Sequence, residues 1–210
     1  MAYDLQEQEQ IDALKGFWAQ WGKLIGGAVL AVSLGFIGFK GWQYYQRTQA
    51  ENAAVVYGQL EPALQAGDLA KAKGVLAALQ KDFAGSAYAA NASLLVAKLA
   101  FDKNELGFAR TQLKWVIEHA GKDETLQAVA RLRLASVLLD EKQYDAALAE
   151  LAMAHPATFD AMFLDLKADV LVARGDIGGA REAYKAALAK SAPEAQVREF
   201  IQAKLDSLGS

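Results

Sequence analysis

The chain has 210 residues, and its 22 lysines and arginines stand against 25 aspartates and glutamates, for a net charge of −3. This balance provides no general attraction to nucleic acid and no polybasic patch for a membrane surface. The length allows one domain of ordinary size with an appendage. The chain has no cysteine, which excludes disulfides, thiolate metal sites and a cysteine nucleophile and is compatible with an oxidising compartment.

Residues 23 to 40, KLIGGAVLAVSLGFIGFK, hold sixteen consecutive uncharged residues between two lysines. A bilayer core about 30 Å thick needs about 20 helical residues. Because lysine stems reach the headgroups from within the apolar layer, residues 22–41 are long enough to cross. We therefore predict a short N-terminal segment at 1–21, a transmembrane helix at 22–41 and a folded domain at 42–210.

Aromatic and basic side chains flank this span on both sides, as expected at the two membrane interfaces. They are Trp18, Trp21, Lys23, Lys40, Trp42, Tyr44 and Tyr45. A soluble protein's central helix and a cleaved signal peptide are the two other interpretations. The sorting of tryptophans to the two ends argues against the first. Four acidic residues before the run and the lack of an Ala-x-Ala site after it argue against the second.

Small residues at Gly27, Ala31 and Gly35 form a stripe within the span. Such a stripe allows another transmembrane helix to approach closely. Glycine is also simply common in membrane helices, and the two interpretations are equally consistent with the sequence. Two basic residues lie shortly before the span and two shortly after it, so their count does not predict its orientation.

After Arg47 the chain is rich in alanine and leucine and is predicted to be helical throughout. Four segments repeat one pattern of a turn, an apolar residue, an alanine and a large apolar residue. The alanines are Ala72, Ala109, Ala147 and Ala180, spaced 37, 38 and 33 residues apart. We interpret each unit as a pair of helices that close up at the small residue.

Residues 166–188, LKADVLVARGDIGGAREAYKAAL, resemble the tetratricopeptide repeat. The shared features are Ala168 in the first helix, the turn Gly175-Asp176, and Ala180 with Tyr184 in the second helix. The predicted fold class is therefore all-α, with a single N-terminal transmembrane helix followed by a tetratricopeptide-like helical-hairpin solenoid.

The last stretch, residues 194–208, is predicted to be an amphipathic helix that caps the final unit. Its apolar residues are expected to face that unit. They are Val197, Phe200, Ile201, Leu205 and Leu208.

Catalytic and metal chemistry is not indicated. The two histidines, His119 and His155, have no second imidazole or cysteine near them in the sequence. The serines lack a GxSxG elbow, and no glycine loop resembles a phosphate cradle. We predict a protein that is not an enzyme, with no cofactor and no metal.

Helical-repeat arrays bind partners on the concave surface, which the first helix of each pair lines. The exposed first-helix positions predicted here form a mixed apolar and charged face that suits a peptide or a partner helix, although a solvated groove is an equally good interpretation for any one residue. These positions are Asn91, Leu94, Lys98, Phe101, Leu132, Ser136, Asp140, Asp165 and Asp169.

The order of these features resembles the YfgM family of ancillary SecYEG translocon subunits. It comprises a short acidic N-terminus, LKGFWAQWGK, a glycine-rich span, GWQYYQ, and then units containing FDKNEL and KADVLVARGD. The resemblance implies a single-pass type II protein of the cell inner membrane, with a cytoplasmic N-terminus and a periplasmic repeat domain. It implies the SecYEG translocon, a PpiD-like membrane-anchored chaperone and secreted client proteins as partners, and a role in passing clients to periplasmic chaperones. It supplies no catalytic residue.

Two alternatives remain open from the sequence. The first is a soluble or peripheral enzyme whose central helix is apolar. The second is a membrane-tethered repeat scaffold for signalling or complex assembly unrelated to secretion, with its repeats facing the cytoplasm.

Overall fold

The computed structural model describes residues 2–192 and 196–209, and every regular element in these ranges is a helix. The chain divides into two compact units, Met1–Glu51 and Asn52–Ser210. The first unit is formed by helix α1 (Ala2–Tyr57), whose last residues belong to the second unit. The predicted segment boundaries at residues 21 and 41 fall within α1 and stay predictions.

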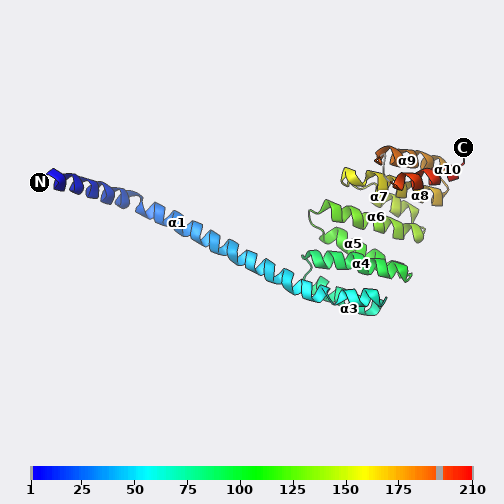
Figure 1. Ribbon diagram of the computed structural model, residues 1–210, viewed down its shortest axis with the longest axis horizontal. Coiled ribbons are helices and arrows are strands. Elements are labelled where there is room, and N and C mark those ends of the chain that lie inside the picture. The colour runs from blue at the N-terminus through cyan, green and yellow to red at the C-terminus, as the bar shows by residue number, and fades with distance from the viewer. Residues whose placement is uncertain (1, 193–195, 210) are drawn as a thin grey trace. The chain divides into compact units, whose positions relative to one another are not determined.

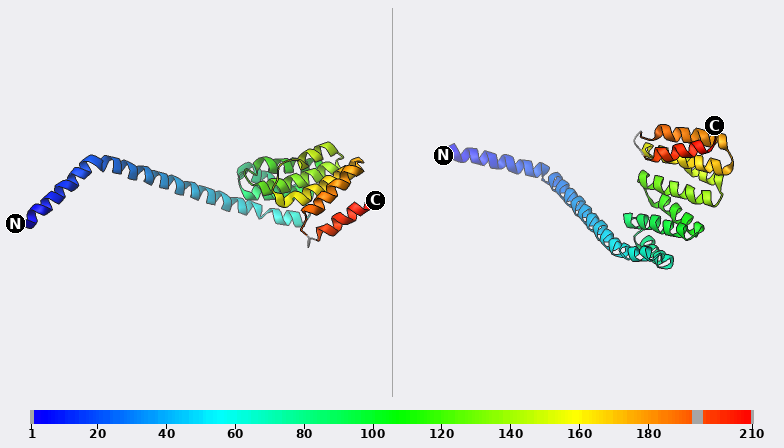
Figure 2. Two further views of the ribbon diagram at one scale, coloured as in Figure 1. Left: turned by 90° about the horizontal axis from the view of Figure 1, so that it is seen from above. Right: turned by 45° about the vertical axis from the view of Figure 1, so that its right-hand side comes forward.

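The second unit is a stack of helices in which each helix packs against the next one along the chain (Figures 1 and 2). The helices are α2 (Leu60–Gln65), α3 (Leu69–Asp82), α4 (Ala87–Asp102), α5 (Leu106–His119), α6 (Glu124–Asp140), α7 (Tyr144–Leu151), α8 (Asp160–Arg174), α9 (Ile177–Lys190) and α10 (Val197–Ser207), with a short 3₁₀ helix η1 (Ala157–Phe159) before α8. The predicted all-α fold with stacked helical pairs is confirmed.

The turn inside each helical pair has the same backbone geometry four times. One residue takes a positive φ, and the next residue donates its N–H to the carbonyl oxygen five residues before it. The residues with positive φ are Gly67, Asn104, Lys142 and Gly175. Such a turn ends one helix and starts the next, and glycine adopts it without the steric cost of a β-carbon.

The four alanines of the sequence repeat lie where the second helix of each pair meets its neighbours. Ala72, Ala109, Ala147 and Ala180 are all 0% exposed, on α3, α5, α7 and α9. Each lies four residues after the turn residue that accepts its N–H, so all four hold the same place in the first turn of their helix. The alanine spacing therefore reports the structural repeat correctly.

The first helical pair departs from the expected pattern because its first helix is broken. The end of α1, where Ala53 is fully buried, and the short helix α2 together precede α3. Gly58 and Gln59 separate them, and Pro62 lies in the first turn of α2, where its missing N–H costs no helical hydrogen bond. The core of this pair therefore includes the last residues of α1, from Asn52 onward.

Helix α10 packs on α9 as predicted, but only part of its apolar face is covered. Ile201 is 1% exposed, and Leu205 and Leu208 pack against the same core cluster. Val197 and Phe200 are 41% and 71% exposed, so the prediction that they face the final unit is wrong. Ile201, Leu205 and Leu208 follow helical spacing on one face, and Phe200 projects about 100° away from them. Residues 194 and 195 of the predicted helix lie outside the described residues.

Candidate partner-binding groove

The first helices α4, α6 and α8 present one common face. Their small core residues Ala97, Ala135 and Ala168 are almost completely buried. The residue that follows each of them is Lys98, Ser136 or Asp169, and these three side chains mark the same position in successive repeats. We call the side of the stack that carries them the first-helix face.

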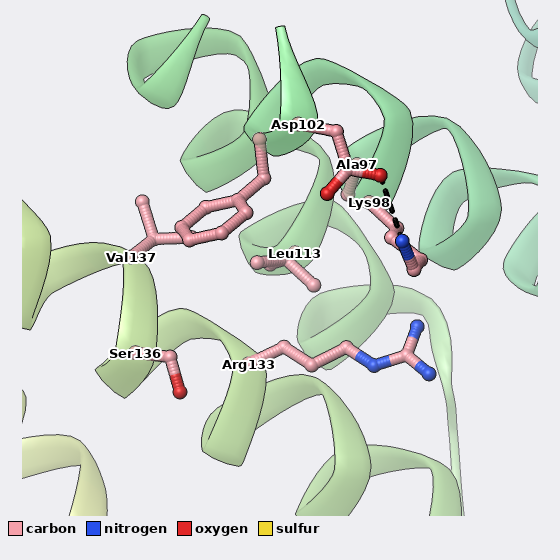
Figure 3. Close-up of a pocket in the computed structure, with 8 residues that line it drawn as sticks. Ala97, Lys98, Asp102, Leu113, Arg133, Ser136 and Val137 are labelled. Carbon is pink, nitrogen blue, oxygen red and sulfur yellow. Dashed lines mark hydrogen bonds and ion pairs between the residues drawn. The ribbon is translucent and has the colours of Figure 1, made fainter. Parts of the chain in front are cut away.

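This face is open at one interface between repeats. Helices α6 and α8 pack directly against each other, whereas α4 and α6 do not pack closely. A cavity of about 390 Å³ lies between α4 and α6, with α5 behind it (Figure 3). It is lined by Ala97, Lys98, Phe101, Asp102, Leu113, Arg133, Ser136 and Val137, and we call it the α4–α6 groove.

The groove has an apolar floor and a polar rim. Ala97, Leu113 and Val137 are buried core residues, and Phe101 is half-buried beside them. Lys98 and Asp102 form an ion pair, with Nζ 2.7 Å from Oδ2. An apolar floor inside a ring of polar groups is the usual construction of a recognition site.

Arg133 leaves one positive charge at the rim. Its Nη1 donates to the carbonyl oxygen of Leu94 at 3.3 Å, and its side chain is exposed. Figure 3 shows Arg133 extended along the groove toward the side where Lys98 and Asp102 meet. Ser136 donates to the carbonyl oxygen of Leu132 at 3.1 Å and therefore offers its oxygen lone pairs to the groove as acceptors.

Three of the nine predicted partner-binding residues, Lys98, Phe101 and Ser136, lie together in the groove. The other first-helix positions of α4 and α6 lie outside it. Asn91 and Asp140 are exposed, and Leu132 is half-buried. Leu94 is only 7% exposed, so the prediction that it is an exposed position is wrong: its side chain packs into the core. A binding role for any of the nine stays a prediction.

Sequence reasoning missed Arg133 and Asp102. The prediction followed a row of positions four apart in α6: Leu132, Ser136 and Asp140. The groove is lined by Arg133 and Val137, which each come one residue later than a member of that row. Arg133 lies three residues before Ser136 and four residues before Val137, so its side chain neighbours both of them on the surface of α6. An i, i+3 search around Ser136 would have found Arg133.

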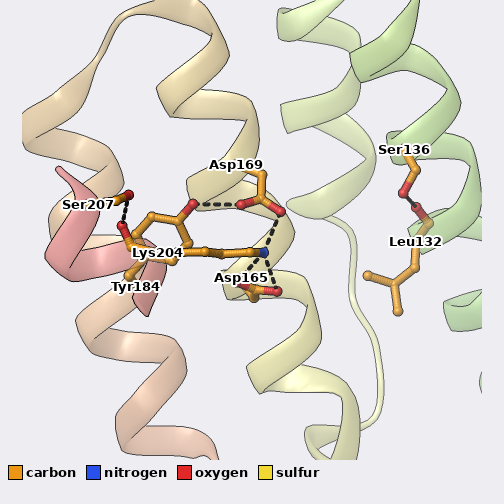
Figure 4. A network of polar contacts seen from close by, with 7 residues as sticks. All are labelled: Leu132, Ser136, Asp165, Asp169, Tyr184, Lys204 and Ser207. Carbon is orange, nitrogen blue, oxygen red and sulfur yellow. Dashed lines mark hydrogen bonds and ion pairs between the residues drawn. The ribbon is translucent and has the colours of Figure 1, made fainter. Parts of the chain in front are cut away.

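The last two predicted residues, Asp165 and Asp169 of α8, lie in a network of polar contacts within the chain (Figure 4). The Nζ of Lys204, on α10, is 3.0 Å from both carboxylate oxygens of Asp165 and 2.8 Å from Oδ2 of Asp169. The hydroxyl of Tyr184 donates to Oδ1 of Asp169 at 2.6 Å. These contacts tie α10 to the first-helix face of the last pair.

Burial and charge act against each other in this network. Burial raises the pKa of the Asp165 carboxyl above its usual value, and this effect outweighs the hydrogen bond and the charge of Lys204, which lower it; the charge of Asp169 adds a smaller rise. Burial lowers the pKa of Lys204, but its hydrogen bonds to Asp169 and Asp165 outweigh that effect, so the pKa of Lys204 is raised. Burial and the hydrogen bond to Asp169 raise the pKa of Tyr184.

We predict that Asp165→Asn does not destabilise the protein at pH 7 and raises its free energy of unfolding by less than about 1 kcal/mol. Because the native pKa of Asp165 is raised, ionisation of this group costs stability as the pH rises above its unfolded value of about 4. The gain should therefore vanish below about pH 4, where both states are protonated. Urea unfolding of both proteins across this pH range measures it.

The matched control is Asp169→Asn, which weakens the acceptor shared by Lys204 and Tyr184. This change should cost about 1 kcal/mol at pH 7. A loss of the same size for Asp165→Asn would contradict the prediction, because it would mean that the ion pair with Lys204 outweighs the burial of the carboxylate.

Helix α1 carries the predicted membrane features on exposed positions. It is the one helix of the described chain that is long and apolar enough to cross a membrane, and none of its apolar window is buried. Trp18 and Trp21 lie before the predicted span 22–41, and Trp42, Tyr44 and Tyr45 lie after it, all of them exposed. The Nζ of Lys40 lies 5.7 Å from the ring centroid of Phe36, within cation–π range. Lys23 is exposed at the other end.

The predicted packing stripe of α1, Gly27, Ala31 and Gly35, is also exposed. A β-carbon added at Gly27 or Gly35 would meet nothing within 4 Å. The stripe therefore leaves room for a close partner, and its role stays a prediction. Among the described residues, no three histidine, aspartate or glutamate side chains are gathered where they could hold a metal.

The sequence matches a known family along almost its whole length. The family model for a tetratricopeptide repeat-like domain matches residues 15–210. A protein from Neisseria gonorrhoeae named ancillary SecYEG translocon subunit is 35% identical over 209 residues, which cover 99% of this chain and all of that protein. The chain belongs to the ancillary SecYEG translocon subunit family.

Two further members of the ancillary SecYEG translocon subunit family show the same extent of similarity. The subunit of Escherichia coli is 36% identical over 205 residues, covering 96% of both chains. That of Haemophilus influenzae is 33% identical over 190 residues, covering 89% of this chain and 91% of its own. Since these matches span the apolar helix and the repeats together, the family includes both units of the structure. The sequence resemblance to this family is confirmed.

Proposed function

We propose that this protein is an ancillary subunit of the SecYEG translocon in the bacterial inner membrane. The observation that carries the proposal is the name that its relatives share, together with similarity over 89–99% of this chain. Helix α1 anchors it, with residues 22–41 in the bilayer and the aromatic residues at both ends in the interfaces. Its role is that of an adaptor, without a catalytic step.

In this proposal the protein is a single-pass type II membrane protein. Residues 1–21 lie in the cytoplasm, and residues 42–210 lie in the periplasm. The repeats receive secreted proteins as they leave the translocon and pass them to a PpiD-like membrane-anchored chaperone. The α4–α6 groove supports this role, because it combines an apolar floor with a polar rim on the first-helix face.

Two measurements test the proposal. Co-purification of the full chain from detergent-solubilised membranes should recover SecYEG, and protease added to spheroplasts should remove the repeats while leaving an N-terminal fragment protected. Retention of an intact chain in protease-treated spheroplasts, with cleavage only after the membrane is opened, would place the repeats in the cytoplasm. That result would favour a cytoplasmic scaffold instead.

Phe101→Ala tests whether the groove holds partner segments. We expect recovery of the chaperone or of a secreted client to fall about tenfold, because an aromatic side chain in a pocket is a typical hot spot. Recovery of SecYEG through α1 should not change. The stability loss should be below about 2 kcal/mol, since Phe101 is only half-buried.

The matched control is Phe108→Ala, which removes another half-buried phenylalanine, outside the residues that line the groove. The two variants should have similar melting temperatures, and only Phe101→Ala should lose the partner. Equal partner recovery with both variants would remove Phe101 from the binding surface.

A further inference from the structure

The α4–α6 groove presents apolar side chains on the first-helix face. At the other end of this face, the contacts of Lys204 with Asp165 and Asp169 fill the space beside α8 with charged groups that already have partners. Between these two places, α6 and α8 pack directly together. An occupant of the groove therefore finds apolar contacts at one repeat interface and polar surface beyond it.

This arrangement suits an extended segment better than a helix. A helix docked in a groove buries anchors at i, i+3 or i+4 and i+7, which needs an apolar strip about 10 Å long. The groove volume of about 390 Å³ lies near the low end of the range of about 300–1,000 Å³ that is common for binding pockets. It has room for one or two apolar side chains on Phe101, Leu113 and Val137.

The positive charge at the rim of the groove favours a bound segment that has an acidic residue next to the apolar one. Lys98 and Asp102 neutralise each other at 2.7 Å, whereas the Arg133 guanidinium donates to the neutral carbonyl group of Leu94. A guanidinium has five N–H donors and binds a carboxylate with two parallel hydrogen bonds. The groove is therefore complementary to an apolar residue followed or preceded by an acidic one.

We infer that the α4–α6 groove binds an extended segment of a secreted polypeptide in which an apolar side chain is adjacent to a carboxylate. The apolar side chain packs on Phe101, Leu113 and Val137, and the carboxylate binds Arg133. This selectivity rests on the proposed role of the groove in receiving clients. It specifies which segments of a client are held: those with an Asp or Glu beside a large apolar residue.

The test uses the full chain purified in detergent and four labelled peptides with identical glycine-serine flanks. Their central pairs are Leu-Glu, Leu-Gln, Leu-Lys and Ser-Glu, and fluorescence anisotropy measures each dissociation constant. We expect the Leu-Glu peptide to bind about threefold more tightly than the Leu-Gln peptide, the size expected of a partly exposed ion pair. The Ser-Glu peptide should bind more weakly than both because it lacks the apolar anchor.

Charge reversal at Arg133 supplies the decisive comparison. Arg133→Glu should invert the order, so that the Leu-Lys peptide binds more tightly than the Leu-Glu peptide. Lys114→Glu, at an exposed position of α5 outside the groove lining, changes the net charge equally and should keep the wild-type order. A reversal in both variants would mean that net charge, not the groove, decides the order, and would overturn the inference.

Wild-type protein that binds Leu-Glu and Leu-Gln equally would also overturn the inference, whatever the behaviour of the variants. A different result would refute the proposed function. If SecYEG does not co-purify but the protein still prefers the Leu-Glu peptide, the translocon role is refuted and the inference about the groove is retained. Co-purification without that preference would refute only the inference.

Discussion

Replacing Leu30 and Leu34 together with lysine should release the protein from the membrane. Both residues lie near the centre of the predicted span 22–41 of α1 and are about 60% exposed. Each lysine at the centre of a membrane helix costs about 2.5–3.5 kcal/mol, so the pair opposes insertion by about 5–7 kcal/mol. The share of the protein that stays in the membrane pellet after a carbonate wash measures the effect.

The control for this pair is Leu30→Ala with Leu34→Ala, which keeps the span uncharged. The alanine variant should remain in the pellet. A lysine variant that also stays in the carbonate-washed pellet would contradict the prediction that insertion of α1 holds the protein in the membrane. After purification in detergent, the repeats of all three proteins should resist protease equally, since none of the changes touches the second unit.

Ala180→Leu should destabilise the last helical pair by about 1–3 kcal/mol. Ala180 is 0% exposed, and its N–H bonds to the carbonyl oxygen of Asp176 in the first turn of α9. The leucine side chain would enter the seam that Ala168 of α8 and Tyr184 share in the same core cluster. The melting temperature in circular dichroism should fall by roughly 2–4 °C for each kcal/mol in a domain of this size.

Ala189→Leu is the matched control, because Ala189 lies on the same helix and is exposed. It should change the melting temperature little. If Ala180→Leu were as stable as the wild type, the two helices would not be held at the separation that a small residue requires. The interpretation of the alanine repeat as a close helix contact would then be wrong.

The alanine repeat and the apolar run could be recognised in the sequence because both are patterns of residues close together along the chain. An alanine at a close helix contact recurs once in each unit, and its spacing of 37, 38 and 33 residues follows from the length of the unit. A run of uncharged residues between lysines and aromatic residues depends only on composition along one helix. These patterns predicted the fold class, the four units and the one long apolar helix.

Other features depend on how helices meet, and a single helix does not encode them. The sequence placed Val197 and Phe200 against the final unit because they are apolar. The structure leaves Phe200 71% exposed because Ile201, Leu205 and Leu208 already fill that interface. Asp165 and Asp169 were predicted as open groove positions, but their contacts with Lys204 join residues 39 and 35 positions apart in the chain.

The sequence by itself determined that this chain is helical, that it repeats and that one helix is suited to a membrane, because each of these properties is set by residues close together along the chain. The tertiary structure alone decided which part of the first-helix face is open. That depends on the distance between α4 and α6, where Phe101, Leu113 and Arg133 meet from three different helices. The spacing between packed helices is set by side chains from all of them at once, so it could be read only after they were assembled.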